Sequence, residues 1–534
     1  MKFTTLSIAL GLVLATTLGY ADPLPETANG SEVYVVDFYE GQEAAGNGYL
    51  QGLAAENKIR ILEVLGSLGD AIIQAPESEV LQIRQQPYVK VVEEDGEMEI
   101  MGWVDEVQPD SLRGRGRHLA EDTPYGINMV NAADVPNLPS GKSWKKVCVV
   151  DTGYENSHPD LPTLDSDAGF SPYGTTQKWD VDGNGHGTHC AGTIGAIGDN
   201  NVGVDSVMNT YGSGFENFFI GKGLQNTGGG SWSGVISAMN KCEEKGASVI
   251  SMSLGGSSSS TSFRDAAKTL HEKGVLLIAA AGNGASSRLS YPASYDHVMS
   301  VAAVSSNRMR ASFSQYNNQV EISGPGVSVK STYRGGTYRN LSGTSMATPH
   351  VAGVAGLVWS HFPDCKPMQI RYALSKTANH EDSNQPRCNT QYGHGVVDAK
   401  AAYDFLAANP CSSWPADFQD NTYVKTGCYV PANDTPWPTP SPVAPPSSTP
   451  APSSAPIEGC EGWCSIVTVP WKPASSGALA KCDWTDYCDK CPECTCKSWC
   501  SAIPVTDIPW NATSTGGRSK CGTFESFCAG CDEC

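Results

Sequence analysis

The chain has 534 residues, a formal net charge of -20 and 40% hydrophobic residues. This length exceeds what one hydrophobic core usually supports, so we expect two or three domains. The acidic balance excludes nucleic acid and anionic membranes as main partners, because a phosphate-binding face needs an excess of Lys and Arg.

Residues 1–21 have the layout of a cleavable secretory signal. An early lysine precedes an apolar run from Ile8 to Leu18, and small residues follow at Gly19 and Ala21. The run is too short to span a bilayer and no later apolar stretch is long enough, so we expect no membrane anchor. The predicted product is secreted, whether extracellular, vacuolar or at the cell surface, where its 19 cysteines are expected to form disulfides.

Residues 22–118 predict a small α+β unit. A strand-like segment at 31–39 is followed by a helix-like segment at 57–65 and by strand-like sequence at 87–100. The unit ends in "SLRGRGRHLAED", which lacks apolar periodicity and is therefore an exposed linker. The basic residues of this linker indicate either a solvated hinge or a processing site.

Residues 119–410 alternate short apolar runs with helical patterns. Strands that are apolar on both faces and separated by helices predict an α/β fold, with a parallel, doubly wound sheet covered by helices on both sides. Ligands of such sheets gather at the carboxyl ends of the strands, and Asp151 and Asn283 both follow predicted strands. The strands are expected within 145–151, 246–254, 274–283 and 297–304, and the helices at 233–245, 262–273 and 345–361.

The C-terminal region has three kinds of sequence. Residues 411–430 are a short cysteine-containing extension, and residues 431–459 are a linker rich in Pro, Ser and Thr. Residues 460–494 and 496–534 are two copies of a six-cysteine repeat, which predicts two small disulfide-rich modules of open connectivity. Zinc bound by the last cysteines of each copy is the alternative. The recurring tryptophans either form the cores of the modules or bind a polysaccharide or protein.

Four short motifs carry side chains suited to acyl transfer. "VCVVDTG" places Asp151 after a buried strand, and "GHGTHCAGT" places His186 in the first turn of a helix. "AAAGN" ends another strand near Asn283. "GTSMATPHVAG" places Ser345 where a glycine-rich turn enters a helix, so that backbone N–H groups and the helix dipole face an oxyanion formed there. Together these are the parts of an activated-serine site, although alone such a serine is ordinarily a helix cap.

On these motifs the chain resembles the subtilisin-like serine proteases of the subtilase family, over about residues 120–405. Residues 22–118 resemble the inhibitory propeptide of that family. The resemblance implies catalysis without a cofactor. The implied roles are nucleophile for Ser345, general base for His186, orientation of the imidazole for Asp151, and oxyanion donor, beside the backbone N–H of Ser345, for Asn283.

The segment "SMSLGG" at 251–256 matches the family's substrate-pairing segment, which binds an extended peptide through main-chain hydrogen bonds. No acidic side chain occurs among the pocket residues that can be placed, including Ser290, so we expect a broad preference for apolar or aromatic side chains. Residues 206–230 depart from the family pattern and leave the outer subsites open. The implied substrate-binding residues are Ser253, Leu254, Gly255, Gly256 and Gly282.

The stretch "DGNGHGTHCAG" also permits a metal-ligand cluster of His186, His189 and Cys190. A metalloprotease H-E-x-x-H motif needs glutamate where Gly187 stands, which weighs against this alternative. The resemblance implies instead that His189 is structural. A cysteine at position 190 is typical of the proteinase K-like and thermitase-like branches, and the first of these is the nearer match.

Seven cysteines lie between Cys148 and Cys428, so at least one should be unpaired unless it bonds outside this region. Cys148 and Cys242 lie close to the positions of a bridge in the proteinase K-like branch, and this likeness implies that they are bonded. The remaining expectations are bonds from Cys365 to Cys388 and from Cys411 to Cys428, and a free thiol at Cys190 behind the catalytic histidine.

Structural calcium is a further expectation from the resemblance. Asp160 in "SHPDL" and Asn200 in "GDNNVGV" match parts of a family calcium site, and their oxygen atoms suit this ion. Glu121 and Glu321 are additional candidate ligands. Each of these residues is equally well explained as a turn residue or a solvated carboxylate.

The sequence therefore predicts a secreted, monomeric serine endopeptidase that acts on proteins or peptides. It is expected to be made as a self-processed zymogen, whose propeptide inhibits it until a cut between about Arg113 and Glu121. The alternative is a binding or adhesive protein, in which the cysteine-rich repeats bind the partner and the protease-like domain has no catalytic activity. The complete set of four motifs argues against that alternative.

Overall fold

The computed structural model describes residues 31–101, 104–105, 121–209, 215, 217–379 and 388–414. The predicted signal segment, the Pro-rich linker, both cysteine-rich repeats and Cys428 lie outside the described residues. Within the described part of the chain, no helix combines the length and the apolar character needed to cross a membrane.

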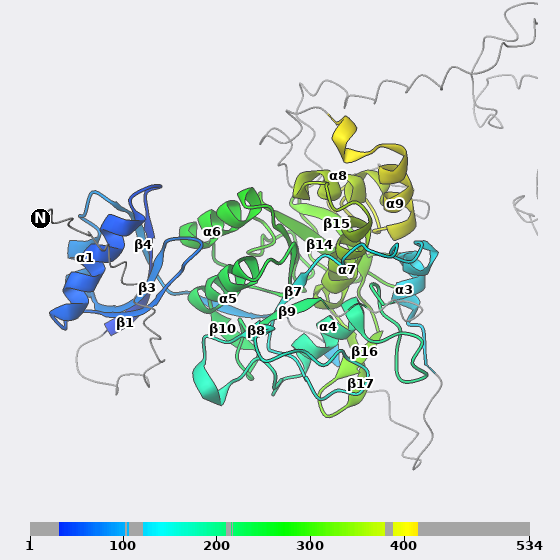
Figure 1. Ribbon diagram of the computed structural model, residues 1–534, viewed down its shortest axis with the longest axis horizontal. Coiled ribbons are helices and arrows are strands. Elements are labelled where there is room, and N and C mark those ends of the chain that lie inside the picture. The colour runs from blue at the N-terminus through cyan, green and yellow to red at the C-terminus, as the bar shows by residue number, and fades with distance from the viewer. Residues whose placement is uncertain are drawn as a thin grey trace, which may run out of the picture. The chain divides into compact units, whose positions relative to one another are not determined.

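A seven-stranded sheet forms the centre of the larger domain, and all of its neighbouring strands are parallel. The strand order is β15-β14-β13-β11-β7-β9-β8. This parallel α/β sheet confirms the predicted fold class (Figure 1). The strands are β7 (Val147–Val150), β8 (Gly169–Phe170), β9 (Phe218–Gly221), β11 (Val249–Met252), β13 (Leu276–Ala280), β14 (Val298–Val304) and β15 (Val320–Pro325).

Helices cover both faces of this sheet because each strand is apolar on both sides. Successive strand residues point to opposite faces, so Val147 and Val149 of β7 lie in one core, and Cys148 and Val150 lie in another. The first core contains α4 (His186–Gly195) and α7 (Thr344–His361), and the second contains α5 (Trp232–Glu244) and α6 (Thr261–Glu272). The other elements are α3 (Tyr125–Met129), α8 (Pro367–Thr377), α9 (Ala399–Ala408), the hairpin β16 (Val329–Tyr333) and β17 (Thr337–Ser342), and the 3-10 helices Ala132–Asp134, Gly174–Thr176 and Cys411–Ser413.

The N-terminal unit is an antiparallel sheet of order β2-β3-β1-β4 that packs against two helices. The prediction of a helix at 57–65 is wrong, because this segment contains strand β2. Ile61 packs against the core of the N-terminal unit, whereas Leu62 packs against the core beneath α5 and α6, so adjacent apolar residues serve two opposite faces. The elements are β1 (Ser31–Phe38), α1 (Glu43–Ala55), β2 (Arg60–Val64), β3 (Ala71–Pro76), α2 (Glu77–Ile83) and β4 (Val89–Glu94).

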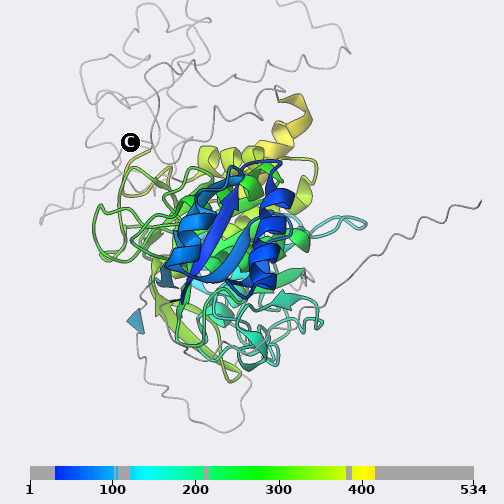
Figure 2. The same ribbon diagram turned by 90° about the vertical axis from the view of Figure 1, so that its left-hand side faces the viewer.

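The N-terminal unit is attached to the larger domain at the amino ends of α5 and α6. Glu93 accepts hydrogen bonds from the backbone N–H groups of Thr261 and Ser262, each at 2.9 Å, at the start of α6. Asp95 accepts one from the N–H of Ser233 in α5, also at 2.9 Å. Carboxylates at these positions satisfy unpaired N–H groups and oppose the positive end of the helix dipole. Figure 2 shows the unit, in blue, from its outer side.

Two disulfide bonds connect elements of the larger domain. The bond between Cys148 of β7 and Cys242 of α5 confirms the predicted pair. The second bond joins Cys365 to Cys411, so the predicted pairs Cys365 with Cys388 and Cys411 with Cys428 are wrong. Cys388 is also disulfide-bonded, but to neither of these two cysteines.

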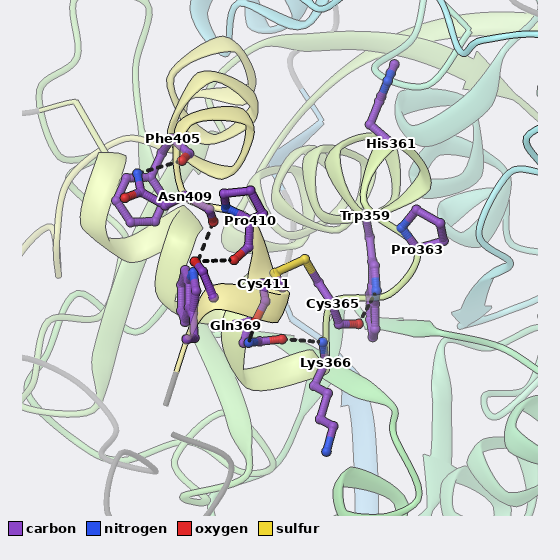
Figure 3. The surroundings of a disulfide bond; sticks show 12 residues. Trp359, His361, Pro363, Cys365, Lys366, Gln369, Phe405, Asn409, Pro410 and Cys411 are labelled. Carbon is purple, nitrogen blue, oxygen red and sulfur yellow. Dashed lines mark hydrogen bonds between the residues drawn. A yellow bond between two sulfur atoms is a disulfide. The ribbon is translucent and has the colours of Figure 1, made fainter. Parts of the chain in front are cut away.

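The packing of α8 against α9 explains the bond between Cys365 and Cys411 (Figure 3). Cys365 lies just before α8, and Cys411 lies just after α9. Gln369 of α8 joins the two segments, since its amide donates to the carbonyl of Cys411 at 2.9 Å and its carbonyl accepts from the N–H of Lys366 at 2.9 Å. This proximity depends on tertiary packing, which the cysteine spacing alone does not report.

Glu321, a predicted calcium ligand, forms a buried ion pair with Arg371. Arg371 Nε donates to Glu321 Oε1 at 2.8 Å, and a second guanidinium nitrogen donates to Oε2. The two side chains are only 5% and 3% exposed. Because both carboxylate oxygens are engaged by a bidentate cation, the residue has a structural explanation without a metal.

Replacing Glu321 with leucine is expected to lower the free energy of unfolding by about 3–5 kcal/mol, because Arg371 then keeps a buried charge without a partner. Denaturant unfolding in a Ser345→Ala background, which prevents self-digestion, measures this. The double variant Glu321→Leu/Arg371→Met should recover most of the loss. An exposed ion pair contributes at most about 1 kcal/mol. A smaller change than this in the free energy of unfolding of the single variant would contradict the prediction.

Candidate active site

Asp151 and His186 form a buried hydrogen-bonded pair. Asp151 directly follows β7, and His186 is the first residue of α4, as the sequence predicted. Asp151 Oδ1 lies 2.8 Å from His186 Nδ1 and also accepts the N–H of Thr152 at 2.7 Å. Burial is the largest single influence and lowers the pKa of His186, but the charge of Asp151, together with Cys190 and the hydrogen bonds of both residues, raises the pKa well above the ordinary value. The ring is therefore held through Nδ1, while Nε2 has no hydrogen-bond partner among the described residues.

Asp182, which the sequence analysis did not single out, holds the loop in front of His186. One carboxylate oxygen accepts from the N–H of Gly185 at 2.8 Å and from the hydroxyl of Thr152 at 3.0 Å. The other accepts from the N–H of Thr188 at 2.9 Å. These bonds connect the turn after Asp151 with the start of α4. An aspartate shortly before a helix is the signal that could have identified this residue.

Ser345 is the second residue of α7 and points into the same region. Its hydroxyl donates to the carbonyl of Ser253 at 3.1 Å and lies 3.4 Å from the carbonyl oxygen of Met101 in the N-terminal unit. It makes no hydrogen bond to His186 Nε2 in this arrangement. Catalytic hydrogen bonds are often long or poorly aligned outside a reacting complex, so the missing bond does not argue against this pair.

Asn283 points its amide nitrogen at the same carbonyl oxygen. Its Oδ1 accepts from the N–H and the hydroxyl of Thr344, at 2.8 and 2.9 Å, and this fixes the orientation of the amide. Nδ2 consequently donates to the carbonyl oxygen of Met101 at 3.1 Å. Asn283 and Ser345 therefore meet around one carbonyl group, which is the geometry that an oxyanion donor and a nucleophile require.

Beside Ser345 and Asn283, a strand of the N-terminal unit lies between two strands of the larger domain and pairs with both. Strand β5 (Glu97–Ile100) of the N-terminal unit lies antiparallel to β12 (Leu254–Gly255) on one side and to β10 (Gly229–Ser231) on the other. The predicted pairing of "SMSLGG" with an extended chain is thus present in the structure. Strand β10 was missed, because it falls at the end of the segment that departs from the family pattern. Its signal is the run "GGGS", since glycines let a backbone approach closely.

The side chain of Met101 packs against the backbone of Gly255. A Cβ atom added to Gly255 would lie 2.0 Å from Met101 Cε, and 3.0 Å from the hydroxyl of Ser290. Gly282 is also required, because it adopts a φ of +110° and an added Cβ would meet the side chain of Gln315. Gly256 exchanges backbone hydrogen bonds with Tyr291 in the same wall. An unbranched apolar side chain thus contacts Gly255.

His189 and Cys190, which follow His186 on α4, are buried and contact its surroundings. His189 Nε2 faces the carbonyls of Val329 and Arg339 at 3.0 and 3.1 Å, and burial lowers the pKa of its ring to about 3. Cys190 is a buried free thiol, as predicted, with Sγ 3.9 Å from His186 Nδ1 and 3.6 Å from the carbonyl oxygen of Ser345.

A metal-ligand cluster of His186, His189 and Cys190 does not form, because His189 turns away to carbonyl groups. Among the described residues, the group close enough to bind a metal is Asp151, His186 and Cys190. The 2.8 Å separation of Asp151 and His186 is that of a direct hydrogen bond, so this group is explained without an ion.

Comparison with known proteins identifies the family. The profile of the subtilase family matches residues 143–395. Subtilisin amylosacchariticus from Bacillus subtilis subsp. amylosacchariticus is 32% identical over 404 residues, which cover 74% of this chain and 98% of that protein. The chain belongs to the subtilase family. As a subtilase, it is a serine peptidase that hydrolyses peptide bonds.

Two further relatives of this subtilase each match about half of the chain. Subtilisin DY from Bacillus licheniformis is 39% identical over 287 residues, which cover 53% of this chain and 99% of that protein. The crystal structure of a psychrophilic subtilisin-like protease from Pseudoalteromonas sp. AS-11 has 30% sequence identity and a TM-score of 0.47, and it covers 54% of this chain and 99% of that chain.

Mercuric ion is expected to inhibit this subtilase about 100-fold by reacting with Cys190, because an added atom at Sγ displaces the ring of His186, and a displacement of about 1 Å has an effect of this size. Hydrolysis of a peptide substrate with and without the reagent measures the effect. The Cys190→Ala variant is the matched control and should resist. Equal inhibition of both proteins would place the reactive group elsewhere.

Proposed function

We propose that this subtilase is a secreted endopeptidase of broad apolar or aromatic preference, made as a self-processed zymogen. The observation that carries the proposal is the convergence of Ser345 Oγ and Asn283 Nδ2 on one carbonyl oxygen, next to the buried Asp151–His186 pair. The predicted placement within the proteinase K-like branch is supported by the Cys148–Cys242 bond and the free thiol of Cys190.

In the proposed mechanism, Ser345 Oγ attacks the carbonyl carbon of the scissile bond while His186 Nε2 takes its proton. Asp151 holds the imidazole tautomer through Nδ1 and stabilises the imidazolium that forms. The side-chain amide of Asn283 and the backbone N–H of Ser345 donate to the oxyanion. His186 then protonates the leaving amine, and water releases the acyl group by the reverse of the same proton transfers.

The N-terminal unit would act as the inhibitor of its own enzyme. Strand β5 fills the cleft between β10 and β12, where an extended substrate would pair. The carboxylates of Glu93 and Asp95 attach the unit to α6 and α5. A protein substrate could therefore enter only after this unit has left.

Substrate preference is inferred from the contact of the apolar side chain of Met101 with Gly255, close to the hydroxyl of Ser290. Protein or peptide substrates with apolar or aromatic residues are the expected partners, and the enzyme is expected to act as a monomer. Binding of a polysaccharide or protein by the cysteine-rich repeats stays a prediction from the sequence.

Labelling with a serine-directed phosphonate tests the proposed function. The reagent should abolish casein hydrolysis and add its mass to the peptide that contains Ser345. A Ser345→Ala protein, which keeps the surrounding residues, should remain unlabelled and inactive. Casein hydrolysis that survives complete labelling, or labelling of another residue, would overturn the proposed catalytic assignment.

Structural calcium is proposed at Asp160 and Asn200, with Glu121 as a further ligand. Asp160 is buried, and burial raises its pKa to about 6. Asn200 Nδ2 donates to one of its oxygens at 2.9 Å. Glu121 Oε1 is buried and has no hydrogen-bond partner among the described residues. The carboxylates of Asp160 and Glu121 are ligands of the kind that calcium takes, whereas Asn200 would contribute only after turning its oxygen, which now accepts from the N–H of Val202, toward the ion.

Removing calcium with EDTA is expected to lower the Tm by about 5–10 °C. This is the shift expected when the protein loses a ligand that was present at about 100 times its Kd. Thermal unfolding of the Ser345→Ala protein with calcium and with chelator measures the difference. The Asp160→Asn variant should show a much smaller response. A Tm that is unaffected by EDTA would contradict the proposed site.

A further inference from the structure

We propose that Lys222 is a positioning residue of this reaction: its buried ammonium group fixes the turn that carries Asp151 and connects that turn to the loop before His186. The inference rests on the proposed catalytic mechanism and adds a residue to it. None of the four motifs of the site contains this lysine, which directly follows strand β9.

The main chain around Lys222 holds Asp151 on both sides. Strand β9 pairs with β7, and the N–H of Asp151 donates to the carbonyl of Gly221 at 3.0 Å. The carbonyl of Asp151 accepts from the N–H of Leu224 at 3.1 Å. The N–H of Lys222 donates to the carbonyl of Phe170 in β8 at 2.8 Å. The side chain of the lysine therefore starts from a fixed backbone beside the catalytic aspartate.

The ammonium group of Lys222 contacts the turn that follows Asp151. It donates to the carbonyl oxygen of Thr152. The N–H of Thr152 in turn donates to Asp151 Oδ1 at 2.7 Å, the same oxygen that lies 2.8 Å from His186 Nδ1. Gly153 leaves room for the lysine, since a Cβ atom added there would lie 3.2 Å from Nζ. Both main-chain groups of Thr152 are therefore engaged, one by the catalytic carboxylate and the other by the lysine.

The same ammonium group is linked to the loop that precedes His186. Nζ donates to Asn226 Oδ1 at 2.8 Å, and this oxygen also accepts from the N–H of Gly183 at 3.2 Å. The carbonyl of Asn226 accepts from the side-chain amide of Asn184 at 3.2 Å. Asn184 Oδ1 accepts from the N–H of His186 at 3.3 Å. Lys222 thus connects the two loops that carry the members of the buried pair.

Lys222 is completely buried, and so are the negative charges that act on it. Burial lowers the pKa of its ammonium group, whereas the charges of Asp182 and Asp151 raise this pKa. Asp151 Oδ2 is buried and has no hydrogen-bond partner among the described residues, so this carboxylate is poorly solvated. The cation at Lys222 supplies part of the charge compensation that the two buried carboxylates need.

Stability alone is a weak explanation for a buried cation at this place, because the cost of desolvating a buried charge can exceed the attraction that it gains. The reaction gives a stronger explanation. The titratable groups that act on His186 include Asp151 and Cys190, which raise its pKa, and the ring of His189. A cation beside the pair opposes this rise, and so keeps His186 neutral, as the reaction needs, over a wider pH range.

Replacing Lys222 with methionine in the mature enzyme tests the proposed role. Methionine is also unbranched but has neither the charge nor the donors. We expect kcat to fall about 100-fold, the effect of displacing a reacting group by about 1 Å. KM should stay within about threefold, because the main-chain pairs of β10 and β12 do not involve this lysine. Kinetics on a peptide substrate measure both constants, with the active enzyme counted by complete labelling with the serine-directed phosphonate.

The pH profile separates a role in the reaction from a general loss of stability. Without the cation, His186 holds its proton more strongly, so the rising limb of kcat/KM in Lys222→Met should move to higher pH by about 0.5 units or more. Lys222→Arg keeps the charge but moves the donors, so it should keep the wild-type limb while kcat falls. An unchanged kcat or an unmoved limb in Lys222→Met would overturn the proposal.

Lys245→Met is the matched control. It removes the same charge from a side chain that is 44% exposed, directly after α5. Its kcat, KM and pH profile should equal those of the wild-type enzyme, because exposed charges are screened by solvent. Equal effects of the two methionine variants would show that only the net charge of the protein matters, which contradicts a positioning role for Lys222.

Asn226→Leu decides the question if Lys222→Met does not fold. This variant keeps the lysine and its contact with Thr152, but removes the oxygen that joins the ammonium group to the N–H of Gly183. We expect kcat to fall about tenfold with little change in KM, since only one of the two links is lost. A wild-type kcat in Asn226→Leu would then overturn the proposal.

Labelling with the phosphonate distinguishes failure of this proposal from failure of the proposed function. A wild-type enzyme that loses all activity on labelling of Ser345, together with full kcat in Lys222→Met, overturns only the role of the lysine. Wild-type activity that survives complete labelling overturns the proposed function as well.

Discussion

Replacing Asp151 with asparagine is expected to lower kcat about 10,000-fold, because the amide cannot hold the imidazole tautomer or stabilise the imidazolium. Kinetics of the mature enzyme on a peptide substrate measure the loss. Asn is nearly the same size, so the buried packing around this position is preserved and the Tm should change little. A loss below about tenfold would show that the 2.8 Å contact is not used in the reaction.

The same variant is expected to change the pH profile. In the wild-type protein burial lowers the pKa of His186, but Asp151 and Cys190 together raise it well above 6.5, with Asp151 making the larger contribution of the two. The reaction needs neutral His186, so kcat/KM should rise as the pH increases through this raised pKa. Without the carboxylate the pKa falls, and the rising limb should move to lower pH while the plateau drops. Identical limbs in both proteins would mean that another group controls the profile.

Replacing Asn283 with leucine is expected to lower kcat about 100- to 1,000-fold with little change in KM, the loss seen when a subtilisin lacks its side-chain oxyanion donor. The amide donates to an oxygen whose charge develops only in the transition state, so substrate binding is largely unaffected. Separate determination of kcat and KM measures the effect.

A comparison with Thr344→Val separates donation from positioning. That variant removes one of the two hydrogen bonds that orient Asn283, at 2.9 Å, but keeps the amide and the backbone bond at 2.8 Å. It should lose less activity than Asn283→Leu. An equal loss in both variants, or an effect of Asn283→Leu on KM alone, would contradict the assigned role.

The central sheet and its helices could be predicted because their signal is local. Strands β7, β11, β13 and β14 are apolar on both faces, and helices α5, α6 and α7 have polar or glycine-rich starts. The segment at 57–65 failed for the opposite reason. Its apolar residues serve two different layers, and the second layer belongs to a part of the chain far away in sequence. Without that layer, a run of adjacent apolar residues does not distinguish a strand from a helix.

The wrong disulfide partner of Cys365 and the ion pair of Glu321 show the same physical limit of the sequence. A disulfide needs two sulfur atoms at bonding distance, and the packing of α8 and α9 decides which cysteines meet. A carboxylate in a loop-like motif can bind a metal or an arginine, and only the arrival of Arg371 decides between them. Composition and spacing contain neither of these contacts.

By itself, the sequence determined the parallel α/β class and the four motifs of the site, while the pairing of Cys148 with Cys242 came from the family resemblance. Chemistry of this kind needs particular residue types at strand ends and helix starts, so it leaves a local pattern. Only the tertiary structure decided that Asn283 and Ser345 meet at the carbonyl of Met101, and that Gly229–Ser231 forms the second wall of the cleft. These contacts join residues that are distant in the chain, and their geometry follows from packing alone.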